Sequence, residues 1–323
     1  MKKVRIEFNR FIKNFSLPEK VKTSVMKAAE TNTYVETVSN KADCLHYHLN
    51  KNYEETLIKE NTNHLKKIIR NKRLGGVKII ADITDEDFYG KVEGLYIHPW
   101  TGEKGVEGKF RYIVAGVLFR NKILPFYVKI LRNGSFKAKL LGDIVDICKS
   151  LVLNVKVLLL DKGFYSGDIM DTLTLKDINY LIFTPKKEIY RFMLEGAEKS
   201  TVIEYEIFYR KSKSVHKAET LLAFVKGVLD YDWIFASNLF FRKAEKYVWL
   251  YKQRWNIETM FRVHDEAKIK TKSKNPVIRL FYFIVGMFLL FIWNLYVKSV
   301  YTFKKFVIVL CELIKEESLL IRY

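Results

Sequence analysis

The order of short apolar segments between residues 77 and 184 limits the fold of this chain more than any other feature of the sequence. Five of them are rich in β-branched and aromatic residues, which favour buried strands. They are residues 77–84, 110–119, 123–130, 155–160 and 179–184. Two segments that suit helices, residues 135–151 and 167–176, separate the last three strands. Three strands followed by alternating helices and strands predict a mixed α/β sheet flanked by helices.

The regions on either side of this core have different sequence patterns. Residues 1–72 have helical patterns, clearest in residues 52–70, and Gly75-Gly76 marks a break. Residues 186–240 contain further strand-like segments, which we interpret as a β-rich insertion, and the chain becomes helical again beyond residue 243. We therefore expect four parts. They are a helical region (1–75), a core (76–185 and 241–300), the insertion (186–240) and a helical tail (301–323).

The charge of the chain indicates a polyanionic partner. There are 56 Lys and Arg residues against 36 Asp and Glu, which gives a net charge of +20. Nucleic acid and an anionic membrane surface are the two usual partners for such an excess, and an ordinary protein from a lysine-rich proteome is the alternative. The three cysteines are scattered without C-x-x-C spacing, which favours a reduced, intracellular compartment.

One apolar segment has two interpretations. Residues 280–297 (LFYFIVGMFLLFIWNLYV) carry no charge, and Arg279 and Lys298 flank them, as they would flank a membrane span. The dense charge elsewhere and the polar Asn294 favour a buried core helix instead. A basic membrane protein anchored by this segment is the alternative, and recovery only in the detergent-soluble membrane fraction would support it.

Two aspartates occupy positions where a charge is costly unless it is paired or binds a metal. Asp82 lies inside the first predicted strand, and Asp161 follows the fourth strand directly. Open α/β sheets place their sites at the carboxyl ends of strands. The predicted layout puts these two strands side by side, so the two carboxylates are expected to be neighbours. Taken singly, each Asp also suits a turn or a strand end.

A third acid belongs to a helical pattern. Tyr251, Arg254, Glu258 and Arg262 are separated by three, four and four residues, so one helix would place them on one face. A single acid among basic and aromatic groups suits metal binding next to a phosphate. A solvated face with salt bridges is the alternative.

These three regions together resemble the DDE transposases of bacterial and archaeal insertion sequences. The stretch Y251-K-Q-R254-W-N-I-E258 is similar to their Y-x2-R-x3-E signature. The region around the first Asp of the family resembles D82-I-T84 with Tyr89-Gly90, and the region around the second Asp resembles D161-K-G-F-Y-S166. Ser237-Asn238 resembles a strand motif that precedes the glutamate helix. The resemblance covers about residues 77–295, and it implies an RNase H-like core.

The resemblance implies a catalytic triad of Asp82, Asp161 and Glu258 that holds two Mg²⁺ ions, with Mn²⁺ as a substitute. Oxygen ligands suit such hard cations. It also implies double-stranded DNA as the partner, both the transposon ends and the target, and a homodimer on DNA. The DNA-contacting residues would be Tyr251, Arg254, Trp255, Arg262, Lys268 and Lys162. Trp100 and Trp233 are further candidates for stacking on a displaced base.

The chain departs from the family pattern at one position. The lysine expected seven residues beyond the glutamate is Asp265 here, and we expect Lys268, nearly on the same helical face, to take its place. The function that follows is metal-dependent cleavage at transposon ends and strand transfer into target DNA, in the cytoplasm of a prokaryote and associated with its nucleoid. A catalytically inactive or domesticated relative that only binds DNA is the alternative.

Two other site patterns are set aside. Cys44, His46 and His48 would share one face of a strand and suggest zinc, but a fourth ligand at the usual spacing is missing. No glycine-rich loop ends in G-K-S/T, so the sequence does not predict a nucleotide cofactor.

Overall fold

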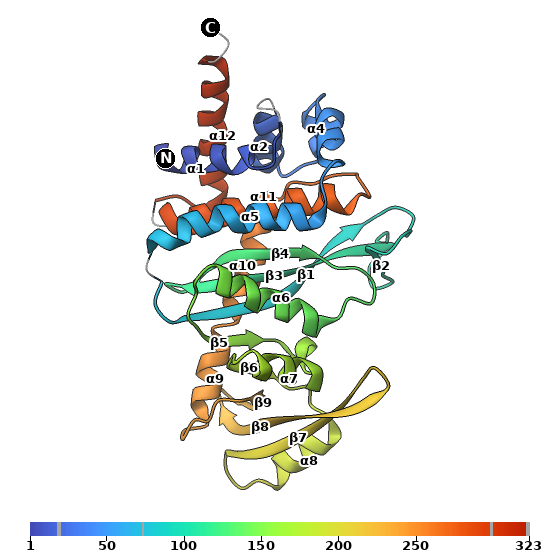
Figure 1. Ribbon diagram of the computed structural model, residues 1–323, viewed down its shortest axis with the longest axis vertical. Coiled ribbons are helices and arrows are strands. Elements are labelled where there is room, and N and C mark those ends of the chain that lie inside the picture. The colour runs from blue at the N-terminus through green and yellow to red at the C-terminus, as the bar shows by residue number, and fades with distance from the viewer. Residues whose placement is uncertain (18–20, 73, 298–299, 321–323) are drawn as a thin grey trace. The chain divides into compact units, whose positions relative to one another are not determined.

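The computed structural model describes residues 1–17, 21–72, 74–297 and 300–320 (Figure 1). The chain folds into two compact units. Unit 1 consists of Met1–Lys72, Ile83–Asn133 and Glu258–Tyr323, and unit 2 consists of Arg73–Asp82 and Gly134–Ile257. Each unit is therefore built from segments that are far apart in the sequence.

The first part of unit 1 is helical, as its sequence pattern predicts. Its helices are α1 (Lys2–Lys13), α2 (Val21–Thr31), α3 (Val35–Val38), α4 (Ala42–Leu49) and α5 (Glu54–Ile69), followed by a short 3₁₀ turn, η1 (Arg70–Lys72). The predicted helix at residues 52–70 corresponds to α5, which buries Leu57, Leu65, Ile68 and Ile69 at helical spacing. The C-terminal helix α12 (Phe303–Leu320) packs against α2.

The strands of unit 1 are the second part of β1 (Val77–Phe88) together with β2 (Ile97–Pro99), β3 (Gly108–Phe119) and β4 (Lys122–Ile130). The predicted strands at residues 110–119 and 123–130 are confirmed as β3 and β4, which pair antiparallel as a hairpin. Arg120 and Asn121 between them have φ of 48° and 59°, as a two-residue type I′ turn requires.

The first strand is longer than the predicted segment 77–84, because β1 continues to Phe88, and β2 lies in the stretch between β1 and β3, for which no strand was predicted. The acidic end of β1 is compatible with a strand because the neighbouring β3 supplies cations. Asp85 lies 3.4 Å from Arg111, and Asp87 lies 3.5 Å from Lys109. Such cross-strand pairs of opposite charge stabilise this end of the strand, which the composition of the segment alone does not predict.

Helix α11 (Pro276–Tyr296) is the apolar segment, and it is a core element of unit 1. The Asn275 side chain accepts hydrogen bonds from the backbone of Val277 and Ile278, so Asn275 caps the helix, with Pro276 in the first turn. Helices α5 and α11 lie together against β4 (Figure 1). Among the described residues, α11 alone is long and apolar enough to cross a membrane, and 83% of its most apolar window is buried. The prediction of a buried helix is confirmed.

Unit 2 contains the mixed sheet that the sequence predicts. Its strand order is β1, β5 (Val155–Leu160), β6 (Tyr180–Phe183), β9 (Tyr231–Ser237), β8 (Ser214–Val228) and β7 (Thr201–Lys211). The β1–β5 and β5–β6 pairs are parallel, and the later pairs are antiparallel. Helix α6 (Lys137–Ser150) packs on α7 (Gly167–Leu175), and α9 (Glu245–Lys252) packs on β6 and β8.

Residues 186–240 form one helix and three strands. The strand-like segments expected in this region are confirmed, since β7 and β8 form a long hairpin (Figure 1). Helix α8 (Glu188–Gly196) was not expected from the sequence. Strand β9 pairs with both β6 and β8, so this region extends the sheet of unit 2. The domain boundaries expected from the sequence stay predictions, and residues 321–323 of the expected tail lie outside the described residues.

Candidate active site

Asp82 and Asp161 occupy equivalent positions on two neighbouring parallel strands of unit 2. In the β1–β5 register, Ala81 pairs with Leu160, and each aspartate is the next residue along its strand direction. Parallel neighbours lie about 5 Å apart across the sheet, so the two backbones are close. Strand β5 ends at Leu160, and Asp161 leads into the 3₁₀ turn η2 (Lys162–Phe164). The predicted adjacency of the two strands is confirmed.

Two side chains, one from the end of α9 and one from the turn that follows it, connect the aspartates. The Tyr251 hydroxyl donates to Oδ1 of Asp161 at 3.1 Å. The Arg254 guanidinium donates from Nε to the Tyr251 hydroxyl at 3.1 Å and from Nη1 to Oδ2 of Asp82 at 2.7 Å. The four side chains, which we call the acid relay, therefore run in the order Asp161, Tyr251, Arg254 and Asp82. All four belong to unit 2.

The middle of the acid relay is buried. Arg254 is 5% exposed and Tyr251 is 2% exposed. The Tyr251 ring packs against Phe183 and Phe235, with centroid distances of 5.4 and 5.2 Å. Burial raises the pKa of Tyr251, and the Asp161 carboxylate adds to this, while the Arg254 cation opposes it. Tyr251 therefore stays a protonated hydrogen-bond donor at neutral pH.

A break between two helices places Tyr251 and Arg254. Helix α9 ends at Lys252, and α10 (Trp255–Asp265) begins three residues later, so the single helical face predicted for residues 251–262 is wrong. The backbone N–H of Arg254 bonds to the carbonyl of Tyr251 at 2.8 Å, and that of Ile257 bonds to the carbonyl of Arg254 at 2.9 Å. These i→i−3 bonds tighten the chain into a turn, which helical periodicity alone does not reveal.

Two further contacts fix this region, and sequence reasoning did not assign either role. Lys78 of β1 donates to the Gln253 side chain at 2.8 Å, which attaches the turn to the strand that carries Asp82. Asn238 accepts from the Tyr180 backbone at 2.9 Å, and Ser237 donates to the Tyr180 carbonyl at 2.6 Å, so this motif fastens the end of β9 to β6. The resemblance identified Ser237-Asn238, but only the structure shows what the pair holds.

Comparison with known proteins gives the family. A model described as the transposase DDE domain matches residues 129–290, which is half of the chain. The chain belongs to the DDE transposase family. The matched region contains Asp161, the turn with Tyr251 and Arg254, and Glu258. No curated protein matches the chain.

A solved structure shows the same fold. The chain is similar to the piggyBac transposase in a cryo-EM synaptic complex with hairpin DNA, with a TM-score of 0.53 and 12% identity. The similarity covers 86% of this chain and 60% of the piggyBac chain. At this identity the likeness concerns the fold alone, and it supports the predicted mixed sheet flanked by helices.

The DDE family pattern also suggests residues on α10 and next to Asp161. Glu258 and Arg262 are exposed on α10, and Glu258 belongs to unit 1. Lys162 is exposed beside Asp161, and Trp255 is 43% exposed. The roles of these residues in metal or DNA binding stay predictions.

The expected position of Lys268 is corrected. Helix α10 ends at Asp265, so Lys268 lies beyond the helix and not on its face. Its Nζ lies 4.0 Å from Oδ1 of Asp265, the residue that stands where the family has lysine. Lys268 therefore does not take the place of the family lysine on the face of α10.

Two alternative patterns are resolved by local contacts. Trp233 is buried and donates from Nε1 to the Val228 carbonyl at 2.8 Å, as a core tryptophan does, whereas Trp100 lies under the Lys109 ammonium at 4.0 Å. Cys44, His46 and His48 lie on helix α4, where alternate residues do not share a face, so the strand-based zinc pattern is wrong. His46 instead contacts the Tyr282 hydroxyl at 3.0 Å.

The donor chemistry of the acid relay suits a divalent cation. Asp82 and Asp161 offer only carboxylate oxygens, which Mg²⁺ and Mn²⁺ prefer. Among the residues that the structure describes, no three His, Cys, Asp or Glu side chains form a metal-binding group. In the acid relay, the Arg254 guanidinium forms a salt bridge with the Asp82 carboxylate. Enzymes of the DDE family typically use divalent metal ions.

Proposed function

We propose that this transposase cleaves DNA at the ends of its element and transfers the freed strand into target DNA, with Asp82, Asp161 and Glu258 as metal ligands. The observation that carries the proposal is the placement of Asp82 and Asp161 at equivalent positions of adjacent parallel strands, joined through Arg254 and Tyr251. Glu258 is added on the family signature, because it follows Arg254 by four residues. The family match over residues 129–290 supports the reaction class.

The residues have distinct expected roles. The carboxylates would hold two Mg²⁺ ions, or Mn²⁺ in their place, which when bound stabilise the attacking and the leaving oxygens of an in-line displacement. Water attacks the phosphodiester at the element end, and the bond to the 3′-oxygen breaks. The freed 3′-hydroxyl then attacks a second phosphodiester, so the number of phosphodiester bonds is conserved in that step. No side chain becomes linked to DNA, so the reaction requires no nucleophilic residue.

Arg254 and Tyr251 would position the scissile phosphate. An arginine presents paired donors that match a phosphate, and a tyrosine offers one hydroxyl. Both are held beside the aspartates by the hydrogen bonds of the acid relay, so they are ordered next to the expected reaction centre. Trp255, Arg262, Lys162 and Lys268 are proposed as further DNA contacts.

Double-stranded DNA is the proposed partner, bound by a homodimer that holds two element ends. The net charge of +20 supports a polyanionic partner, and the piggyBac transposase of similar fold was solved with hairpin DNA. We propose residues 1–75 as the region that recognises the element end, and the cytoplasm, with association to the nucleoid, as the location.

The direct test is Mg²⁺-dependent nicking of a duplex that carries the DNA flanking the gene. Wild type should nick this duplex near the inverted repeat, and Glu258→Ala should bind it with unchanged affinity but leave it intact. If both proteins bind equally and neither nicks the duplex with Mg²⁺ or Mn²⁺, the chain is a DNA-binding relative without catalytic activity.

A further inference from the structure

The segment between α10 and α11 presents four lysines along one side of an extended backbone. Buried side chains, Ala267, Ile269 and Thr271, alternate with Lys268, Lys270, Lys272 and Lys274, which are half-buried or exposed. We call these four lysines the lysine edge. Such alternation is typical of an extended chain, in which residues on the same side are about 7 Å apart.

Backbone pairing holds this segment in place. Lys270 forms a parallel β-bridge with Tyr34, in which the Val35 N–H donates to the Lys270 carbonyl at 3.0 Å and the Lys270 N–H donates to the Thr33 carbonyl at 3.2 Å. The bridge joins the segment to the loop before α3, and both belong to unit 1. The lysine edge is therefore attached to the helical part of the unit.

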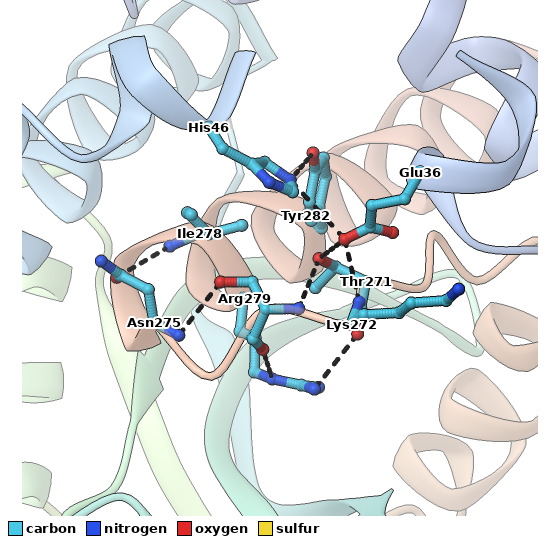
Figure 2. A network of polar contacts seen from close by, with 9 residues as sticks. Glu36, His46, Thr271, Lys272, Asn275, Ile278, Arg279 and Tyr282 are labelled. Atoms are coloured by element: carbon cyan, nitrogen blue, oxygen red, sulfur yellow. Dashed lines mark hydrogen bonds and ion pairs between the residues drawn. The ribbon is translucent and has the colours of Figure 1, made fainter. Parts of the chain in front are cut away.

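Two side chains, Glu36 and Arg279, form hydrogen bonds to the segment (Figure 2). Oε1 of Glu36 accepts from the Thr271 hydroxyl at 2.6 Å and from the Lys272 backbone at 2.9 Å. Arg279 of α11 is 4% exposed and donates to the carbonyls of Ser273 and Thr271 at 2.7 and 3.1 Å. It also pairs with Glu86 at 3.2 Å. These contacts restrict the backbone under the lysines before any ligand binds.

The lysine edge borders a hollow of about 440 Å³, which Lys268, Lys270 and Lys272 line together with Tyr34, Phe88 and Tyr89. The acids near it are engaged by cations of the same unit. Glu86 pairs with Arg279 and Asp87 with Lys109, whereas Glu93 lies 3.2 Å from Lys274 and Asp265 lies 4.0 Å from Lys268. Lys270 and Lys272, in the middle of the edge, form no ion pair within the part of the chain that the structure describes, although Asp265 interacts electrostatically with Lys270 and Glu36 is a further acid that bonds to the Lys272 backbone.

We propose that the lysine edge is a docking surface for the phosphate backbone of duplex DNA, centred on Lys270 and Lys272. Regularly spaced ammonium groups on a braced extended segment can follow a row of phosphates without reading the bases. The charge of the surface and the +20 charge of the chain favour a polyanion, and this inference rests on the proposed DNA partner. The surface adds affinity and orientation, and sequence choice is made elsewhere.

The test compares two pairs of lysines in unit 1, using the full chain and a labelled mixed-sequence duplex in a fluorescence anisotropy titration across a range of salt concentrations. The double variant Lys270→Gln/Lys272→Gln should bind roughly ten-fold more weakly at low salt, and its salt slope should be shallower by about two. The control Lys104→Gln/Lys305→Gln removes the same charge from exposed positions outside the edge, and should change the affinity by less than about two-fold. Equal losses for the two pairs, or no loss for either, would overturn the proposal.

A second comparison separates the shape of the edge from its charge. Glu36→Ala removes the brace and also one negative charge, so charge alone predicts tighter DNA binding, whereas loss of the brace predicts weaker binding. We expect weaker binding with an unchanged salt slope. Glu36→Gln keeps an oxygen that accepts from Thr271 and Lys272, and should bind at least as tightly as wild type. Tighter binding by Glu36→Ala, in a protein whose circular dichroism matches wild type, would contradict a preformed surface.

The outcomes distinguish this inference from the proposed function. If wild type does not nick DNA but Lys270→Gln/Lys272→Gln weakens binding, the docking surface holds and the catalytic proposal fails. If wild type nicks DNA and the variant binds and nicks normally, the docking surface is wrong and the catalytic proposal holds. If Lys270→Gln/Lys272→Gln no longer binds vesicles containing phosphatidylserine but binds DNA as tightly as wild type, the lysine edge belongs to an anionic lipid surface. This result would overturn the inference.

Discussion

The acid relay of unit 2 and the lysine edge of unit 1 handle charge in opposite ways. In the acid relay, a buried arginine pairs with one carboxylate, and a buried tyrosine donates a hydrogen bond to the other. In the lysine edge, the buried groups hold the backbone, while Lys272 and Lys274 are exposed and Lys268 and Lys270 are half-buried. Burial makes an uncompensated charge costly, so the buried Arg254 is paired with Asp82 inside the fold, whereas an exposed cation can be neutralised by a ligand. We therefore expect substitutions in the acid relay to affect catalysis or folding, and substitutions in the lysine edge to affect DNA binding.

The largest effect should come from the carboxylate at the end of β5. Asp161→Asn should lower Mg²⁺-dependent nicking by at least about 1,000-fold, because an amide is a poor ligand for a hard cation, while DNA affinity stays within about two-fold. Single-turnover nicking and anisotropy on the same DNA measure the two quantities. Asp146→Asn, an exposed carboxylate on α6, is the matched control and should nick normally. Nicking by Asp161→Asn at the wild-type rate would remove Asp161 from the catalytic set.

The next effect concerns folding. Arg254→Met should lower the free energy of unfolding by about 3 kcal/mol, because it takes the guanidinium away from a partly buried Asp82 and from Tyr251. Urea denaturation measures the change. Adding Asp82→Ala to Arg254→Met should recover part of the loss, because the carboxylate that needed the cation is gone. Strictly additive losses would show that the two side chains are not coupled, and the acid relay would then lose its stabilising role.

A smaller effect is expected for the tyrosine in the middle of the acid relay. Tyr251→Phe should cost about 1.5 kcal/mol at neutral pH, since one hydroxyl serves both Asp161 and Arg254. Burial raises the pKa of Tyr251 in the folded protein, so its contribution is complete below the ordinary tyrosine pKa of about 10 and is lost as pH rises toward the folded value. The stability difference between wild type and Tyr251→Phe should therefore shrink in alkaline buffer.

Thermal denaturation at neutral and alkaline pH checks this prediction. The exposed Tyr53 provides the control for loss of a tyrosine hydroxyl, and Tyr53→Phe should change the midpoint of unfolding little at neutral pH. A difference for Tyr251→Phe that stays constant, or grows, as the solution becomes more alkaline would mean that its hydroxyl is not held as a neutral donor.

The smallest effect tests an exposed aromatic beside the acid relay. Trp255→Ala should weaken binding to single-stranded DNA by about ten-fold with no change in the midpoint of thermal unfolding, because one stacked base is lost and no core contact is broken. Trp249→Ala is the matched control, since Trp249 is 53% exposed and also lies near the Lys252 ammonium, at 5.3 Å. Equal losses of affinity for both variants would indicate nonspecific binding of DNA to exposed aromatic residues and not stacking at Trp255.

Much of the fold could be read from hydrophobic pattern. Strands β3, β4 and β5 and helices α5, α6 and α7 lie where the sequence predicts them, because each buries a continuous apolar set at its own period. The acidic end of β1 was missed, because its stability depends on Arg111 and Lys109 of another strand. Helix α8 was also missed, and its residues lie in a stretch whose neighbours are strands.

The candidate site was predictable to a similar extent. Strand position identified Asp82 and Asp161, and the signature identified Tyr251, Arg254 and Glu258. Periodicity predicted one helix through residue 262, whereas i→i−3 hydrogen bonds turn the chain between α9 and α10. Tyr251 and Arg254 were expected at DNA phosphates, and the structure shows them bonded to the two aspartates. A spacing rule carries no information about such partners, because they come from distant strands.

The amino-acid sequence specifies which residue types are available and in which order: two aspartates at strand ends, a tyrosine and an arginine at helical spacing, and alternating lysines after Asp265. Tertiary structure decided what each one contacts. Parallel pairing of β1 with β5 makes neighbours of Asp82 and Asp161, which 79 positions separate in the sequence. Glu36 and Arg279 convert the lysine alternation into a braced edge. The physical reason is that local periodicity is set by backbone geometry, whereas the pairing of charges is set by which distant segments burial brings together.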